Sequence, residues 1–126
     1  MSRGGWDTSL KEHDFRSDVK PLPEIINVPK AIDYTPDIAP DESFLLFTSN
    51  RPLISDKEDM YIQISFRNPA GTWSTPKKLI SIQSRFPSLS PDGKYLFFCG
   101  DDGNIYWVDK KIIEPFRPAS PSPVVK

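Results

Sequence analysis

The hydrophobic side chains of this sequence come in short runs of about four residues, and proline or glycine interrupts the chain between the runs. No stretch keeps the 3.6-residue period of an amphipathic helix over several turns. Residues 59–66 alternate strictly, with one apolar side (Met60, Ile62, Ile64 and Phe66) and a second side formed by Tyr61, Gln63 and Ser65. Short strands with frequent turn signals are typical of an all-β protein, which is the fold class that the pattern predicts.

The pattern occurs twice. Residues 34–50 and residues 85–100 align without a gap at a spacing of 51 residues, and both contain a Pro-Asp turn followed by an apolar run. Self-similarity on this scale indicates a repeat architecture. The runs Phe44–Phe47 and Tyr95–Phe98 are apolar at every position, so each is predicted to be a strand that is covered on both faces.

Each of the two units is predicted to contain up to four strands. The first unit has them at residues 36–39, 43–49, 59–66 and 72–79, and the second unit at residues 87–90, 94–99 and 105–108. Tyr106 aligns with Tyr61, 45 residues earlier. In place of a fourth strand in the second unit, Asp109 caps a short helical turn that Pro115 ends. Ahead of the first unit, Ile25–Ile26 is predicted to be a short edge strand, because prolines flank it.

The Pro-Asp turns of the two units differ at one position. Asp41 and Asp92 are expected to form turns by bonding to the backbone, rather than to act in catalysis. Gly93 can take a positive φ without cost, whereas Glu42 at the same place cannot do so cheaply. Either Glu42 is strained, or its turn has a different shape.

Both units resemble the TolB-like, WD-repeat-like β-propeller repeat of bacterial proteins. The resemblance rests on the block P-x-I/L-x-P-D-x-x-Y/F-L-x-F, followed by a loop and then D/N-I/M-Y. Residues 36–47 with 59–61 meet this pattern, and so do residues 87–98 with 104–106. The resemblance implies that each unit is one blade, a four-stranded antiparallel sheet.

The chain then divides into four parts. Residues 1–22 form a polar leader or the remnant of a preceding blade, and residues 23–80 form blade one. Residues 81–118 form blade two, which lacks its outer strand, and residues 119–126 form a disordered tail.

Two blades cannot close a ring, because propellers of this family close with about six to eight. Each blade would therefore leave one broad apolar face uncovered. Three outcomes are open: the chain assembles with copies of itself, it is the C-terminal part of a longer propeller, or its ends fold back over the open faces. The fragment interpretation is favoured as an evolutionary account, and self-association is expected of the isolated chain.

Composition narrows the classes of partner. The 126 residues carry a net charge of −1, so no basic field indicates binding to nucleic acid or to an anionic membrane. No apolar run approaches the roughly 20 residues of a transmembrane helix, and the N-terminus lacks the apolar region of a secretory signal. A cytoplasmic location is expected for the chain as written, although relatives in the family are often periplasmic or associated with the envelope.

Catalytic chemistry is not predicted. The sequence contains no nucleophile elbow, zinc-protease, phosphate-loop, dinucleotide-binding or paired-cysteine motif. His13 and Cys99 are the only residues of their types and have unlike settings, so they do not form a nucleophile–base pair. Cys99 is expected to be a buried structural thiol. No catalytic residue, metal site or cofactor is therefore assigned.

Loops at the ends of propellers carry function in general, and two loops supply the candidate binding residues. These are Asn50, Arg51 and Asp59 in the first loop, and Asp101, Asp102 and Asn104 in the second. The second loop has the oxygen ligands that Ca²⁺ uses, but a turn that needs these residues for backbone reasons is favoured. Across the first loop, Arg51 is expected to pair with Asp59. Trp73 and Trp107 are expected to pack between blades rather than to bind a partner.

These features favour a non-catalytic protein-interaction or scaffold module, which binds a protein partner or itself through uncovered blade faces. One alternative is an accessory propeller piece of a peptidase or of an enzyme that acts on saccharides. A second alternative is a degenerate remnant without a selected function.

Overall fold

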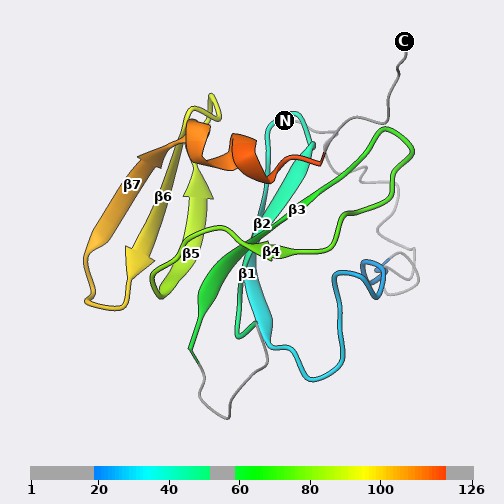
Figure 1. Ribbon diagram of the computed structural model, residues 1–126, viewed down its shortest axis with the longest axis horizontal. Helices are drawn as coiled ribbons and strands as arrows, with labels where there is room; N and C mark the ends of the chain where they lie inside the picture. The colour runs from blue at the N-terminus through cyan, green and yellow to red at the C-terminus, as the bar shows by residue number, and fades with distance from the viewer. Residues whose placement is uncertain (1–18, 52–58, 119–126) are drawn as a thin grey trace, which may run out of the picture.

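Two antiparallel β-sheets and one short helix make up the computed structural model, which describes residues 19–51 and 59–118 (Figure 1). The first sheet has the order β1-β2-β3-β4, with strands at Asp33–Ile38, Phe44–Ser49, Tyr61–Phe66 and Lys77–Lys78. The second sheet has the order β5-β6-β7, with strands at Ser84–Leu89, Tyr95–Gly100 and Ile105–Asp109. A 3₁₀ helix, η3, follows at Lys110–Phe116. The predicted all-β class and the short C-terminal helix are confirmed, while most of the predicted leader and the predicted tail lie outside the described residues.

Positions 51 residues apart share their local backbone geometry. β1 and β5 begin 51 residues apart, and both contain a register shift at the corresponding place. Within the shifts, Thr35 has φ of 51° and Phe86 has φ of 60°, which is the left-handed region that side chains with a Cβ rarely adopt. The two halves of the chain therefore carry the same irregularity at equivalent positions.

The third strand of the second sheet is placed differently from the sequence alignment. Tyr106 pairs with Phe98, and the equivalent pair in the first sheet is Gln63 with Phe47. Tyr106 thus corresponds to Gln63 and not to Tyr61, because the shorter loop after β6 lets β7 begin pairing sooner. The slip is two residues, so every side chain keeps the predicted side of the sheet.

The main core lies between the two sheets, which pack through one face of each (Figure 1). The inner face of the first sheet consists of Phe44, Leu46, Ile62, Ile64 and Phe66. The inner face of the second sheet consists of Leu96, Phe98, Tyr106 and Val108. Ile113 of η3 joins this core and is almost fully buried. Burial of each large aliphatic side chain of this kind stabilises the fold by about 1.5–3 kcal/mol.

A buried hydroxyl group joins the two left-handed residues across this core. Thr48 is fully buried, and its Oγ1 accepts a hydrogen bond from Phe86 N at 3.0 Å. The same oxygen lies 2.6 Å from Thr35 Oγ1. Because Thr35 donates its hydroxyl proton to the carbonyl of Tyr34 at 2.7 Å, the Thr48 hydroxyl is the donor to Thr35. Thr48 thus holds β5 against β1 and β2.

Further polar contacts fix β5 against the first sheet. Asp37 Oδ2 accepts a hydrogen bond from Leu89 N at 2.7 Å. At the other end of β5, Ser84 N donates to the carbonyl of Met60 at 3.0 Å, and Ser84 Oγ accepts from Ile62 N at 3.3 Å. The sheets are therefore held by directional hydrogen bonds as well as by apolar burial.

The outer face of the first sheet is covered by chain that precedes β1. Leu45 and Phe47 pack with Ile26 and with the half-buried Trp73. The prediction that Phe44–Phe47 is covered on both faces is confirmed, since every residue of β2 is buried. Ile26 does not lie in the predicted edge strand: it lies in a turn, where its N–H donates to the carbonyl of Pro23 at 2.9 Å.

The second sheet is covered on one face only within the described chain. Leu96 and Phe98 are buried, whereas Tyr95 and Phe97 are 38% and 41% exposed, so the prediction of cover on both faces is wrong for this strand. The reason is that one neighbouring sheet can cover only one face. We call the uncovered side the open face, and its large side chains are Tyr95, Phe97, Ile105 and Trp107.

Two side chains of the open face differ from expectation. Trp107 does not pack between sheets: it is 63% exposed. Cys99 pairs with Ile105 on this side and is half-buried rather than buried. Trp73 does pack, but against the cluster of Ile26, Leu45 and Phe47 on the outer face of the first sheet.

Two predicted boundaries change. β4 pairs only at Lys77–Lys78 instead of over residues 72–79, since Pro76 has no N–H to donate, and an isolated bridge joins Arg67 to Trp73. Asp109 caps η3 as predicted, with Oδ1 accepting from Lys111 N at 2.9 Å, but the helix passes Pro115 and ends at Phe116.

The Pro-Asp turns have one shape in both units. Glu42 has φ of 64° and Gly93 has φ of 74°, so the turn does not change shape and Glu42 is the strained residue. Asp41 and Asp92 each accept a hydrogen bond from the backbone N–H two residues on, at 3.0 Å. Hydrogen bonds to side-chain and backbone groups lower the pKa of both carboxyl groups.

Replacing Glu42 by glycine should raise the free energy of unfolding by about 0.5–1 kcal/mol, because glycine takes a positive φ without strain. Gly93→Ala is the matched control and should lower it by a similar amount. Urea unfolding followed by circular dichroism measures both variants. A destabilised Glu42→Gly variant would show that the turn is not strained.

Thr48→Val should lower the free energy of unfolding by about 1–3 kcal/mol, because the N–H of Phe86 loses its acceptor inside the contact between the sheets. Thr48→Ser keeps the hydroxyl and should cost less than Thr48→Val. Equal losses in the two variants would assign the effect to packing of the methyl group instead.

Candidate functional site

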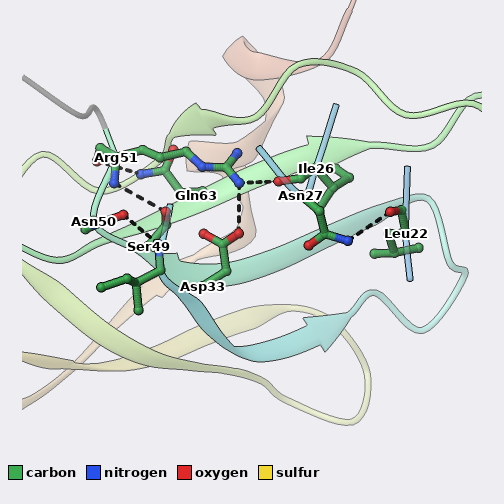
Figure 2. Close-up of polar contacts among 9 residues, drawn as sticks. Leu22, Ile26, Asn27, Asp33, Ser49, Asn50, Arg51 and Gln63 are labelled. Atoms are coloured by element: carbon green, nitrogen blue, oxygen red, sulfur yellow. Dashed lines mark hydrogen bonds and ion pairs between the residues drawn. The ribbon is translucent and has the colours of Figure 1, made fainter. Parts of the chain in front are cut away.

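Arg51 is the most highly connected of the six candidate binding residues. Its side chain is 11% exposed and runs along the outer face of the first sheet (Figure 2). Nη2 donates to Asp33 Oδ2 at 2.9 Å and to the carbonyl oxygen of Ile26. The guanidinium also lies 5.2 Å from the ring centroid of Phe47, in cation–π range. One charged side chain thus holds the segment before β1 on the apolar outer face.

The backbone around Arg51 is fixed by neighbouring polar side chains. Arg51 N donates to Ser49 Oγ at 3.2 Å, and the Arg51 carbonyl accepts from Gln63 Nε2 at 3.2 Å (Figure 2). Asn50 Oδ1 accepts from Ile32 N at 2.9 Å. These contacts satisfy polar groups of the chain itself, among them the buried side chains of Ser49 and Gln63, so their first role is structural.

The expected ion pair between Arg51 and Asp59 is wrong, since Arg51 pairs with Asp33. β1 and β2 are antiparallel and Asp33 is paired with Ser49, so the start of β1 lies beside the residue after β2. Arg51 Nε and Asp33 Oδ1 are buried and have no hydrogen-bond partner among the described residues. Asp59 is half-buried just before β3.

The loop between β6 and β7 is built on Asp102. Its carboxylate accepts hydrogen bonds from Asn104 N at 3.0 Å, from Asn104 Nδ2 at 3.2 Å and from the Tyr106 hydroxyl at 2.5 Å. Gly100 leaves room for the Tyr106 ring, because a Cβ there would lie 2.6 Å from Tyr106 Cε1. The loop therefore uses its acidic and amide groups for its own geometry.

These hydrogen bonds shift two pKa values in opposite directions. The Tyr106 hydroxyl, and then the N–H of Asn104, lower the pKa of Asp102. The hydrogen bond that the Tyr106 hydroxyl donates to Asp102, and to a lesser extent desolvation, raise the pKa of Tyr106 above its ordinary value of 10.0. The contact is complete when Asp102 is ionised and Tyr106 is neutral.

The structure separates the candidate residues into groups. Asn50 and Arg51 belong to the outer face of the first sheet. Asp101 and Asp102 line an open depression of about 580 Å³ together with Tyr61, Ser81, Ile82, Gln83, Gly100 and Tyr106. In the described part of the chain, no three His, Cys, Asp or Glu side chains are grouped to hold a metal ion. The described part of the chain also contains no helix that is long and apolar enough to cross a membrane.

The open face was not among the candidate site residues. Tyr95, Phe97 and Trp107 line a shallow apolar depression of about 240 Å³ there. The rings of Tyr95 and Trp107 meet edge to face, with centroids 5.5 Å apart. The sequence predicted uncovered faces without saying which side of which sheet, and it placed Trp107 in a packed contact.

No protein-family model, curated protein or solved structure matches the chain.

Asp102→Asn should return the pKa of Tyr106 toward 10.0, because the accepting carboxylate is lost. In the native chain, the stabilising contact is present above the ordinary Asp pKa and below the ordinary Tyr pKa. It is lost as pH falls through the folded pKa of Asp102, or rises through that of Tyr106. NMR titration of ¹³Cζ-labelled tyrosine measures the shift, and Tyr95 is the internal control. An unchanged Tyr106 pKa in Asp102→Asn would contradict the assignment.

Proposed function

We propose that this chain is a non-catalytic protein-interaction module, built from TolB-like repeat units, that binds a protein partner through the open face. One observation carries the proposal: four large apolar side chains on neighbouring positions of β6 and β7 remain exposed. Soluble proteins rarely leave contiguous apolar surface uncovered unless it binds something.

The chemistry of the open face supports a protein partner. Trp107 and Tyr95 are among the side chains most often found at the energetic centres of protein interfaces. Their edge-to-face contact orients both rings, so less side-chain freedom is lost when a partner binds. The strands beneath are anchored in the core, β6 by Leu96 and Phe98 and β7 by Tyr106 and Val108.

The shared geometry of the two units supports the repeat origin. Equivalent positions have the same left-handed backbone conformation, the same register shift and the same turn. The stacking of one sheet on the next also agrees with consecutive blades of a propeller.

Trp107→Glu should weaken protein association through the open face by about 30-fold or more, since it places a charge at an apolar contact. Ile82→Glu is the matched control, because Ile82 is an exposed apolar residue away from the open face. Affinity capture and sedimentation with the native chain and both variants measure the effect. The proposal fails if Trp107→Glu alters no association, whether with the chain itself or with another protein. Turnover of peptides or oligosaccharides by the purified chain would also contradict it.

A further inference from the structure

We infer that the partner of the open face is the open face of a second copy of this chain, in a dimer with two-fold symmetry. The inference rests on the proposed function and names its partner. A second copy can reach the open face in two ways. It can present the same face, or it can present the outer face of its first sheet and so continue the stacking head to tail.

Head-to-tail stacking would copy the contact that already exists inside the chain. In that contact, Asp37 and Thr48 accept backbone N–H groups of Leu89 and Phe86. The residues 51 positions later, on the open face, are Ser88 and Cys99. A thiol is a weak acceptor, and a serine hydroxyl is shorter and uncharged. The open face therefore offers weaker or shorter acceptors than the first sheet does for the N–H groups of another such sheet.

The other half of a head-to-tail contact is also obstructed. The outer face of the first sheet already carries Ile26 and Trp73 on Leu45 and Phe47. Arg51 fastens this cover by donating to the Ile26 carbonyl. A second copy would have to displace the cover before it could stack there.

The open face is complementary to itself. Its central row, Phe97 beside Trp107, carries no charge. Arg85 lies at one corner, on β5 in the row of Cys99, and Asp109 lies at the diagonally opposite corner, on β7 in the row of Tyr95. A two-fold axis along the other diagonal places Arg85 of each copy opposite Asp109 of its partner.

This arrangement fixes the remaining contacts. Phe97 meets its own equivalent near the axis, Trp107 lies over Cys99 of the other copy, and the strands cross near 90°, a recognised mode of sheet packing. The face of three strands measures roughly 15 by 17 Å. A stable interface needs about 800 Å² per partner, so a weak dimer that forms with rising concentration is expected.

A mixing experiment separates the two arrangements. The native chain, studied by sedimentation up to about 1 mM, should stop at the dimer. N-terminally labelled Trp107→Glu chain is then mixed with excess unlabelled native chain. In the symmetric dimer, the labelled variant stays monomeric, because each contact needs two intact open faces. Labelled Ile82→Glu should instead enter dimers as readily as labelled native chain.

Two other outcomes overturn the inference. Recruitment of labelled Trp107→Glu by the native chain, or assembly beyond the dimer, would establish head-to-tail contact. A native chain that stays monomeric at every concentration would also overturn it, and the proposed function would still stand if another protein binds in a Trp107-dependent way. As a separate readout, dimer formation should slow maleimide labelling of Cys99, the single cysteine of the chain.

Discussion

A β-sheet has two faces, and an apolar strand in its middle is stable only if both faces are shielded from water. The first sheet of this protein meets that requirement with two different covers. The second sheet covers its inner face, and the segment before β1 covers its outer face through Ile26. Two other features serve this cover: Arg51 holds the segment before β1 on the outer face, and Ile113 of η3 packs into the core between the sheets.

The second sheet does not meet this requirement, and its uncovered side is the open face to which we assign function. The second sheet has one neighbour among the described residues, so one of its faces stays exposed. The polar groups that fix one sheet on the next are present at Asp37 and Thr48, but their counterparts are Ser88 and Cys99. The end of the stack thus differs in chemistry from its interior, and its aromatic character suits a protein contact better than another sheet of the same kind.

The predicted loop residues act differently from the aromatic face. Arg51 and Asp102 are engaged with groups of their own chain: Arg51 donates to Asp33, and Asp102 accepts from Asn104 and Tyr106. Charged and amide side chains in loops are chosen as binding candidates from a sequence, because the same side chains serve both backbone geometry and binding. Exposed aromatic residues within a strand attract less, since the usual place of such residues is a core.

Sequence alone determined the all-β class, the turns at Asp41 and Asp92, the alternation of β3 and the helix cap at Asp109, because each depends on local periodicity or on bonds within a few residues. It also located two segments, 51 residues apart, that share a register shift and a turn in the structure. Only the tertiary structure decided that Arg51 pairs with Asp33, that Glu42 takes the left-handed conformation, and that Tyr95 and Phe97 face outward while Leu45 and Phe47 are covered. These outcomes depend on which distant segment lies against each face. An apolar strand has the same sequence pattern whether its second face contacts Ile26, another sheet or solvent.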